Sequence, residues 1–307
     1  PERDRQGGAL FFMLTLIIVM LLVLGGLWAF GPGIWCYFKI TRQAGRKSFS
    51  SLPGDFGYAY SDLKIKGENG VNLACWFIPS RQKKGVLIAS HNLGGNKSSA
   101  FTYLRPYVDE GYSLLMYDFR GHGGSDKAAC TLGYLETKDL LIITDYVKSQ
   151  LAEGSPIFYW GFSLGATVSL LAAARGGCVK AVIAHSPFVS LNQVLRHYAK
   201  AFYHVPSRTS TFITLCLMKR YQGVLAEDVD VARAARRLGD MPIMLIGGAR
   251  DRQVPEEWLM RLAALLPKAE LLLGPYGHWE LPFTEVYNVS SRPDIERGIA
   301  FLKEHTC

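Results

Sequence analysis

The hydrophobic positions divide the chain into one uninterrupted apolar stretch and a longer region in which short apolar runs alternate with amphipathic ones. Residues 9–30 carry no charge, and at the rise of an α-helix they span roughly 33 Å, about the thickness of a bilayer core. The pattern therefore predicts one transmembrane helix. A cleaved signal peptide is the alternative, but its apolar core has only about 7–15 residues and ends in small residues, whereas Trp28 and Phe30 flank Ala29 here.

The residues after the apolar stretch predict how the chain leaves the membrane. Gly31-Pro32-Gly33 predicts the end of the helix, since proline and glycine interrupt helices. We therefore assign residues 1–38 to a tail and anchor and residues 39–57 to a linker. Two basic residues precede the stretch and four follow it: Arg3, Arg5, Lys39, Arg42, Arg46 and Lys47. The positive-inside rule then favours, by a narrow margin, a single-pass membrane protein whose globular part is cytoplasmic.

Beyond the linker, the pattern predicts a sheet built mostly of parallel strands. Residues 58–66 and 71–78 alternate apolar and polar positions around Gly67-Glu68-Asn69-Gly70, which predicts an antiparallel hairpin. Wholly apolar runs separated by amphipathic stretches follow, as is typical of buried strands joined by helices. The predicted strands are 86–90, 113–117, 157–160, 182–184, 242–246 and 270–273, and the predicted helices are 135–151, 164–175 and 293–304. We expect one α/β domain over residues 58–307, with an eight-stranded, mostly parallel sheet and helices on both faces.

A segment of about fifty residues, 187–240, is longer than a simple crossover between strands requires. It contains helical stretches at 191–202, 211–222 and 229–238. Because the carboxyl ends of parallel strands form the ligand crevice, an insertion there predicts a helical lid. Its large apolar residues are expected either to line an acyl pocket or to pack the insertion onto the domain: Phe202, Tyr203, Phe212, Ile213, Leu215 and Leu217.

Composition and charge exclude several classes of function. The net charge of +8 is spread along the chain, so we expect no nucleic-acid partner, only a membrane surface beside the basic residues that follow the helix. The six cysteines include no C-x-x-C pair and no Cys/His set at zinc-ligand spacing, so we expect reduced thiols and no metal. No HExxH, P-loop or G-x-G-x-x-G motif occurs, and we expect no cofactor.

Gly161-Phe162-Ser163-Leu164-Gly165 follows a predicted strand and opens a predicted helix, which is the setting of a nucleophile elbow. The glycines permit a sharp turn, and the turn exposes the serine hydroxyl at the edge of the sheet. The amides at the start of the helix favour negative charge that develops there. Ser163 is therefore the candidate nucleophile.

Four further motifs follow predicted strands: Ser90-His91-Asn92-Leu93-Gly94-Gly95, Tyr117-Asp118-Phe119-Arg120-Gly121-His122-Gly123-Gly124-Ser125, Gly248-Ala249-Arg250-Asp251-Arg252-Gln253-Val254-Pro255 and Gly277-His278. Together with the G-x-S-x-G pentapeptide, they make the chain from about residue 58 onward similar to the α/β-hydrolase superfamily. Its monoacylglycerol-lipase-like and serine-aminopeptidase-like branches are the ones it resembles most. The resemblance implies the α/β-hydrolase fold.

The resemblance also implies a catalytic triad, which in this superfamily runs serine, acid, histidine along the chain. Ser163, Asp251 and His278 keep this order. The histidine would remove the serine proton, and the carboxylate would orient and stabilise the imidazole. By the same resemblance, the backbone amides of Leu93 and Leu164 would form the oxyanion hole, although Asn92 stands where the family usually has glycine. Asparagine tolerates left-handed backbone conformations, which would let that loop form.

The sequence leaves competing residues open. His185 ends a predicted strand and is the rival base, while Asp228, Asp230 and Asp240 are rival acids. His91 and His122 lie in loop motifs, where structural hydrogen bonding is the expected role. His197 and His204 lie in the insertion and are expected at the surface or facing substrate, and His305 lies near the end of the chain.

The expected function is hydrolysis of an ester or thioester with a lipophilic acyl group, through an acyl-enzyme on Ser163. The partners expected are a small acyl substrate, lipid included, and the membrane. A peptidase or amidase of the serine-aminopeptidase type is an alternative, and Glu227, Asp228 and Asp230 are the only acidic cluster in the insertion that could hold a substrate amine. A non-catalytic binding protein with the same fold is a second alternative.

Overall fold

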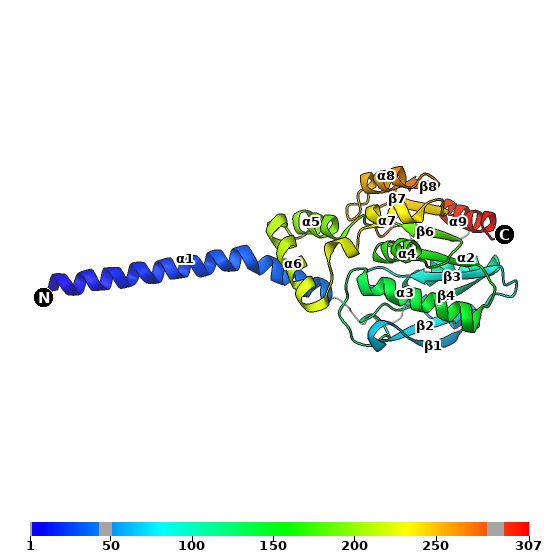
Figure 1. The fold of residues 1–307 in the computed structure, drawn as a ribbon, viewed down its shortest axis with the longest axis horizontal. Coiled ribbons are helices and arrows are strands. Elements are labelled where there is room, and N and C mark those ends of the chain that lie inside the picture. Colours follow the sequence, from blue (N-terminus) through cyan, green and yellow to red (C-terminus); the bar gives the residue numbers. More distant parts are fainter. Residues whose placement is uncertain (1, 43–50, 281–291, 307) are drawn as a thin grey trace.

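The structure, a computed structural model, describes residues 2–42, 51–280 and 292–306. A long helix, α1 (Glu2–Thr41), projects from an α/β domain, with the lid helices between it and the sheet (Figure 1). The other helices are α2 (Phe101–Asp109), α3 (Tyr134–Tyr146), α4 (Leu164–Ala174), α5 (Leu191–Ala201), α6 (Ser207–Gln222), α7 (Val231–Leu238), α8 (Glu256–Leu265) and α9 (Pro293–Glu304). Short helical turns lie at Pro53–Phe56, Glu68–Gly70, Lys97–Ala100, Val147–Leu151 and Ala226–Asp228.

Eight strands form one sheet in the order β1-β2-β4-β3-β5-β6-β7-β8. They are β1 (Ser61–Lys66), β2 (Asn72–Ile78), β3 (Gly85–Ser90), β4 (Tyr112–Tyr117), β5 (Ile157–Phe162), β6 (Ala181–His185), β7 (Ile243–Gly248) and β8 (Ala269–Gly274). β1 pairs antiparallel with β2, β2 pairs antiparallel with β4, and every later pairing is parallel. The predicted eight-stranded, mostly parallel sheet is confirmed.

Successive strand residues point to opposite faces of the sheet, and helices cover both faces. In β5, Ile157 and Tyr159 pack into the cluster beneath α3, α4 and α8, whereas Phe158 and Trp160 pack into the cluster beneath α2 and α9. All residues of β3, β4, β5, β6 and β7 are buried. This two-sided burial is why these strands are continuous apolar runs in the sequence.

The lid helices α5, α6 and α7 lie within residues 191–238, inside the segment where the insertion is expected. α2 and α8 were not predicted. α3 ends at Tyr146 and passes into a π-helical turn, Val147–Leu151, so the stretch expected as one helix is two elements.

The expected end of the first helix at residues 31–33 is wrong, because α1 continues through Pro32 to Thr41. Pro32 removes one backbone hydrogen bond, but tertiary contacts hold the following turns. Thr214 Oγ1 on α6 donates a hydrogen bond to the Gly33 carbonyl at 3.0 Å. The Cys130 amide donates to the Thr41 carbonyl at 3.3 Å. The expected linker therefore begins as helix, and Arg46 and Lys47 lie outside the described residues.

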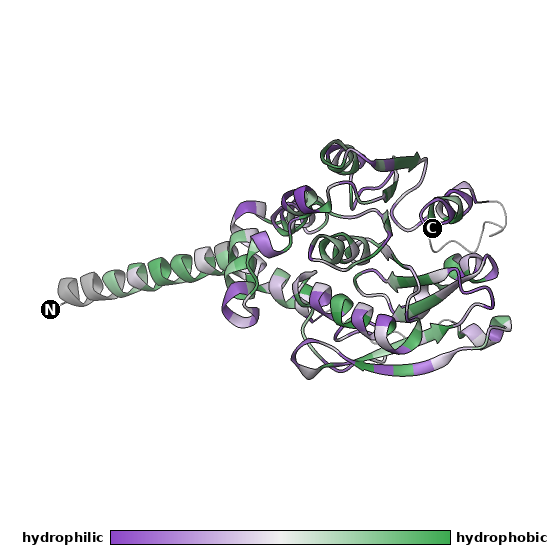
Figure 2. Ribbon diagram, turned by 45° about the vertical axis from the view of Figure 1, so that its right-hand side comes forward, coloured by the Kyte–Doolittle hydropathy of each residue, from purple (hydrophilic) through white to green (hydrophobic). Residues whose placement is uncertain are grey.

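α1 has two environments along its length. Its large side chains from Phe11 to Phe30 are exposed, with Trp28 at 70%. The helix is long and apolar enough to cross a membrane, and it projects as a largely hydrophobic rod beyond the domain (Figure 2). By contrast, Cys36, Tyr37 and Ile40 are buried against the lid. The domain therefore covers only the last part of the helix.

The packing of α1 on α6 depends on Gly33. A Cβ atom on Gly33 would lie 2.6 Å from Cβ of Ile213, whereas a Cβ atom on Gly31 would meet nothing within 4 Å. We expect Gly33→Leu to lower the melting temperature of the detergent-solubilised protein by several degrees, corresponding to about 1–3 kcal/mol of overpacking.

Gly31→Leu is the matched control, because both substitutions raise helix propensity by about the same amount. Thermal unfolding of the two variants measures the difference. Equal melting temperatures would contradict the packing of α1 against α6.

Candidate active site

Ser163 lies at the turn between β5 and α4 with φ 55° and ψ −114°, a strained conformation for a residue with a side chain. Its amide donates to the His185 carbonyl at 2.8 Å, which ties the turn to β6. The flanking glycines are sterically required. A Cβ atom on Gly161 would lie 2.3 Å from the Gly165 carbonyl oxygen, and one on Gly165 would lie 2.0 Å from the Ser90 carbonyl oxygen.

The structure brings together the three residues that the sequence singled out. His278 Nε2 lies 3.1 Å from Ser163 Oγ, and His278 Nδ1 lies 2.7 Å from Asp251 Oδ2. These contacts fit a neutral imidazole that donates from Nδ1 to the carboxylate and accepts from the serine hydroxyl at Nε2. Asp251 and His278 are each only 5% exposed, so the hydrogen bond between them is shielded from water.

Two loops position this acid and base. The second oxygen of Asp251, Oδ1, accepts hydrogen bonds from the amides of Gln253 and Val254, both at 2.8 Å. The loop carrying His278 is closed by Glu280, whose Oε2 accepts from the Gly277 amide at 2.9 Å and from Arg250 at 3.0 Å. The carboxylate therefore joins the loop of the acid to the loop of the base.

Aromatic rings flank the imidazole of His278. The Phe162 ring lies 4.9 Å from it and the Trp279 ring lies 5.2 Å from it, centroid to centroid. Phe162 is buried and Trp279 is half-exposed. The two rings limit rotation of the imidazole away from Ser163.

The loop after β3 carries the predicted oxyanion donor, Leu93. The Asn92 carbonyl accepts from His91 Nδ1 at 2.7 Å and from the Gly95 amide at 3.1 Å. Since the carbonyl and the next amide of a trans peptide point in opposite directions, these two bonds also fix the direction of the Leu93 N–H. Among the described residues, no hydrogen bond occupies the Leu93 amide.

Leu164 is the first residue of α4, so its amide has no partner within the helix. Both predicted oxyanion donors are therefore available to a ligand beside Ser163.

Asn92 does not use the left-handed conformation expected for it, and in this loop the positive φ of 73° belongs to Gly94. Asn92 Nδ2 instead donates to the Leu93 carbonyl at 2.9 Å. Its side chain thus braces the peptide that follows the oxyanion donor.

His91 and His122 have structural roles, as expected. His91 Nε2 accepts from the Phe119 amide at 3.0 Å, and His122 Nε2 accepts from the Gly94 amide at 3.2 Å. Burial lowers the pKa of both histidines, that of His91 well below its ordinary value. Each ring therefore stays neutral and keeps the tautomer that these bonds require.

A buried ion pair joins the loop after β3 to the loop after β4. Lys97 Nζ lies 2.7 Å from Asp118 Oδ2, and the two side chains are 3% and 0% exposed. Asp118 also accepts from the amides of Lys97 at 2.6 Å and Gly124 at 2.8 Å. The motif after β4 thus links its loop to the oxyanion loop without contributing a charge to the pocket.

An apolar pocket opens beside Ser163, with about 580 Å³ of empty space that includes its mouth. Its walls come from α1, the start of α4, the lid segment and the loops after β3, β4 and β7: Ile40, Leu93, Leu132, Leu164, Phe188, Val194, Leu195, Tyr198, Tyr203 and Val254. Apart from the Ser163 hydroxyl and two tyrosine hydroxyls, these side chains are hydrocarbon. The pocket can therefore hold a substrate's apolar part next to the nucleophile.

Of the lid residues expected either to line a pocket or to pack, Tyr203 lines this one. Phe212 is 68% exposed, Ile213 packs on Gly33, and Leu215 and Leu217 pack against the large core cluster. Ile40 was missed because it belongs to the segment assigned to the linker. Its spacing of four residues from Cys36, which is also buried, is the helical signal that could have revealed it.

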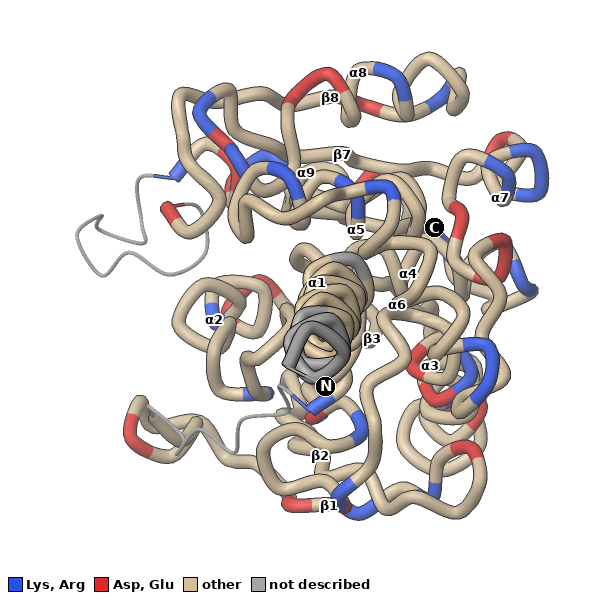
Figure 3. Tube along the Cα trace, turned by 90° about the vertical axis from the view of Figure 1, so that its left-hand side faces the viewer, with Lys and Arg blue, Asp and Glu red and all other residues tan. Residues whose placement is uncertain are grey.

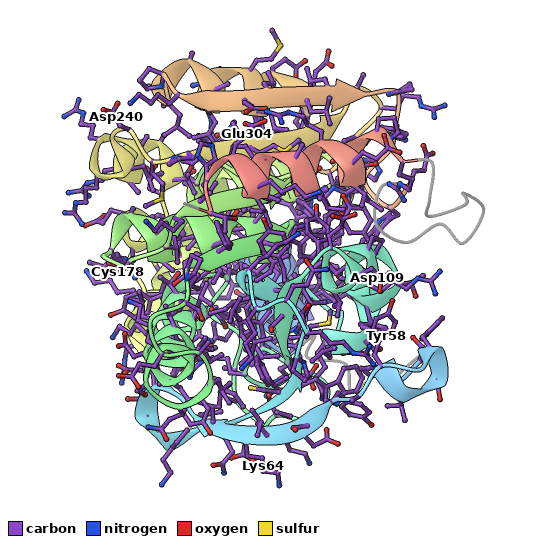
Figure 4. All side chains as sticks on the ribbon, turned by 90° about the vertical axis from the view of Figure 1, so that its right-hand side faces the viewer. Tyr58, Lys64, Asp109, Cys178, Asp240 and Glu304 are labelled. Atoms are coloured by element: carbon purple, nitrogen blue, oxygen red, sulfur yellow. The ribbon has the colours of Figure 1, made fainter. Side chains whose placement is uncertain are left out.

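The rival base and one rival acid lie outside this arrangement. His185 is fully buried, and its Nε2 contacts the Tyr103 hydroxyl at 3.2 Å. Asp240 is exposed and pairs with Lys268 at 3.1 Å. Figure 4 shows Asp240 on the side of the domain that faces away from α1, together with Cys178, Glu304, Tyr58 and Asp109.

The acidic cluster of the lid borders a different pocket, which shares no lining residue with the one at Ser163. Asp230 Oδ1 caps α7 by accepting from the Arg233 amide at 2.9 Å, and Asp228 Oδ2 accepts from the Leu225 amide at 2.8 Å. Viewed along α1, the charged segments of α7 lie at the rim of the molecule (Figure 3). Glu227, Asp228 and Asp230 are therefore not positioned to bind a substrate at Ser163.

The remaining candidate residues lie outside the triad. His197 Nε2 bonds the Arg252 carbonyl at 2.8 Å, and His204 is exposed. Within residues 2–42, 51–280 and 292–306, no group of three or more His, Cys, Asp or Glu is placed to hold a metal ion. Five cysteines in the same ranges are free: Cys36, Cys75, Cys130, Cys178 and Cys216.

Comparison with known proteins gives related folds. The sequence model of the serine aminopeptidase family S33 matches residues 81–229. The uncharacterized protein YqkD of Bacillus subtilis is 25% identical over 252 residues, which cover 81% of this chain and 77% of YqkD. An uncharacterized protein of Mycobacterium tuberculosis is 27% identical over 225 residues, covering 71% of this chain and 72% of its own.

Among solved structures, an esterase of Pyrococcus furiosus superposes with a TM-score of 0.69 at 25% identity, covering 87% of this chain and 99% of the esterase. Est1E from Butyrivibrio proteoclasticus, with ferulic acid bound, superposes with a TM-score of 0.59 at 18% identity, covering 79% of this chain and 98% of its own. These neighbours share the fold, and the predicted resemblance is confirmed. The chain belongs to the α/β-hydrolase superfamily.

Proposed function

We propose that this protein is a serine hydrolase that cleaves esters or thioesters of lipophilic acyl groups through an acyl-enzyme on Ser163. The observation that carries the proposal is the hydrogen-bonded series from Asp251 to His278 to Ser163, with distances of 2.7 and 3.1 Å, at the wall of an apolar pocket. A serine hydroxyl needs such a base to become nucleophilic at neutral pH.

In the first half of the reaction, Ser163 Oγ attacks the substrate carbonyl carbon while its proton moves to His278 Nε2. The carbonyl oxygen becomes an oxyanion, which the amides of Leu93 and Leu164 stabilise. Collapse of this intermediate breaks the bond to the leaving alcohol or thiol, which takes the proton from His278. Asp251 stays ionised and stabilises the transient imidazolium.

In the second half, His278 accepts a proton from water, and the resulting hydroxide attacks the acyl-enzyme. The same two amides stabilise the second oxyanion. Ser163 leaves as the hydroxyl, with the proton returned by His278, and the carboxylic acid is released.

The lining of the pocket supports a lipophilic acyl group. Each buried methylene contributes about 0.8 kcal/mol, and the wall beside Ser163 offers Leu93, Leu132 and Phe188 for such contacts. Within the described residues that line it, no charged side chain is available to bind a free amine or a carboxylate. This is the reason for preferring acyl esters over aminoacyl substrates.

We propose further that α1 anchors the protein in a membrane as a single span. The helix is apolar and exposed from Phe11 to Phe30, and uncovered apolar area of this extent needs a nonpolar surrounding. Its last turns pack into the lid. A helix built into the folded domain in this way is a permanent part of the protein, which favours an anchor over a cleaved signal peptide.

Chemical labelling tests Ser163 as the nucleophile and His278 as the base. We expect the detergent-solubilised protein to be labelled by a fluorophosphonate probe, and Ser163→Ala and His278→Ala to lose labelling. The same variants should lose at least about 10⁴-fold in kcat on a short acyl ester, as in other triads.

Ser169→Ala, a buried serine of α4, and His204→Ala, an exposed lid histidine, are the controls and should keep labelling. A Ser163→Ala variant that kept full activity would contradict the proposed mechanism. A correctly folded wild-type protein that resists the probe and hydrolyses no ester would instead indicate a non-catalytic binding protein.

The choice of substrate separates an esterase from an aminopeptidase. We expect kcat/KM for an octanoyl ester to exceed that for the acetyl ester by at least about ten-fold, since six more methylenes enter the pocket. Leucyl p-nitroanilide, with its free ammonium group, should react at least about 100-fold more slowly than the octanoyl ester. N-acetyl-leucyl p-nitroanilide controls for the amide bond itself. Faster turnover of the free aminoacyl amide would favour the peptidase.

The rival base, His185, has a different role that the pH dependence of stability can test. Burial lowers its pKa from the ordinary value to about 4. Between pH 6.5 and 4 the unfolded chain therefore binds more protons at this residue than the folded chain, and stability falls as the pH falls. This residue adds up to about 1.4 kcal/mol of lost stability per pH unit in that window.

We expect His185→Leu to reduce the drop in melting temperature between pH 7 and pH 5 while keeping fluorophosphonate labelling of Ser163. Replacement of the exposed histidine, His204→Leu, should leave the drop unchanged. Loss of labelling in a folded His185→Leu protein would reopen the assignment of the base.

A further inference from the structure

The end of α1 forms part of the pocket at Ser163. Ile40 is 7% exposed and lines that pocket, although it lies in the helix that projects away from the domain. In Figure 1 the last turns of α1 run in among the lid helices α5 and α6. Ile40 therefore makes the apolar helix part of the wall of the pocket that contains the nucleophile.

A second, narrower cavity lies behind Ile40, between α1, α5 and α6, with about 210 Å³ of empty space that includes its opening to solvent. It shares four walls with the pocket at Ser163: Ile40, Leu195, Tyr198 and Tyr203. The far side is closed by residues of α1 and α6, among them Cys36, Ser210 and Thr211. Ile40 and these three lid side chains thus separate two spaces that would otherwise be continuous.

The backbone that carries Ile40 is held on both sides. Before it, Gly33 lies against Ile213 and accepts a hydrogen bond from Thr214. After it, the Thr41 carbonyl accepts a hydrogen bond from the Cys130 amide at 3.3 Å. Because the helix cannot shift without breaking these contacts, the backbone at Ile40 is held in place and its side chain stays in the wall of the pocket.

The chemistry changes across this wall. On the Ser163 side the nearby lining is hydrocarbon. On the far side, Ser210 Oγ and Thr211 Oγ1 are buried without a hydrogen-bond partner among the described residues. Because these hydroxyls are already buried, an acyl chain admitted past Ile40 would cost them no further hydration.

We propose that Ile40 sets the length of acyl chain that this enzyme accepts, by closing the pocket at Ser163 against the cavity between α1, α5 and α6. The inference rests on the proposed hydrolysis at Ser163 and adds a specificity-determining residue to it. The anchor helix is therefore part of the substrate site and not only an attachment to the membrane.

The test is a series of p-nitrophenyl esters from butanoyl to hexadecanoyl, assayed on the full chain in detergent. We expect Ile40→Ala to join the two spaces and to raise the ratio of kcat/KM for long over short esters by about ten-fold or more. Ile40→Phe should lower that ratio by a similar factor. One or two methylenes in an apolar pocket are worth about that much discrimination.

Ile34→Ala is the matched control. Ile34 is on the same helix but 42% exposed, and it lines neither the pocket at Ser163 nor the cavity between α1, α5 and α6. This variant should keep the wild-type ratio. The labelling rate with a small fluorophosphonate and the melting temperature check that Ile40→Ala and Ile40→Phe leave Ser163 and the fold intact.

A second readout separates this inference from the proposed reaction. The rise in melting temperature on adding free fatty acids of four to sixteen carbons reports the chain length that binds best, without turnover. A protein that binds fatty acids with an optimum that Ile40→Ala lengthens, but hydrolyses no ester, would refute the proposed function and keep the role of Ile40. The same optimum and the same ester ratio in wild type, Ile40→Ala and Ile40→Phe would overturn the role of Ile40 and leave hydrolysis standing.

Discussion

The start of α4 lies so close to the end of β3 that a side chain on Gly165 would meet the Ser90 carbonyl oxygen at 2.0 Å. This closeness brings the Leu164 amide beside the loop of Leu93, and it leaves Ser163 no relaxed conformation to adopt. The strain at φ 55° is held by the hydrogen bond from the Ser163 amide to β6. Because these constraints are in the main chain, the loops after β7 and β8 need only deliver a carboxylate and an imidazole to a position that is already fixed.

α1 is one continuous helix whose two ends lie in different environments. Its first turns have the exposed apolar surface that a bilayer would cover, and its last turns have the glycine contact and the buried side chains of a domain core. A rigid connection of this kind fixes the direction of the lid relative to the helix axis. The pocket at Ser163 is then oriented with respect to any membrane that holds the helix, which a flexible linker would not achieve.

The sequence predicted the parts of the molecule that follow from local pattern and chain order. Buried parallel strands are continuous apolar runs, so β3 to β7 were found to within about two residues, and the elbow with its acid and histidine followed from motif order. The end of α1 was wrong because Gly31-Pro32-Gly33 is a helix breaker by local rules, while contacts with Thr214 and Ile213, nearly two hundred residues away, hold the helix. The orientation of α6 was equally beyond the sequence. Phe212 and Ile213 are adjacent and both apolar, and only packing decides that one is exposed and the other buried.

Charge is used around the site but kept out of the pocket. The Lys97–Asp118 pair and the neutral histidines His91 and His122 brace the loops from behind, while the walls beside Ser163 are apolar. In such surroundings the effective dielectric constant is low, so hydrogen bonds from the Leu93 and Leu164 amides to the proposed oxyanion would be stronger than in water. The same low dielectric penalises a substrate that brings an unpaired ammonium group. This one property of the pocket underlies both the proposed acyl transfer to Ser163 and the proposed preference for acyl esters over aminoacyl substrates, although the matching sequence model is named for aminopeptidases.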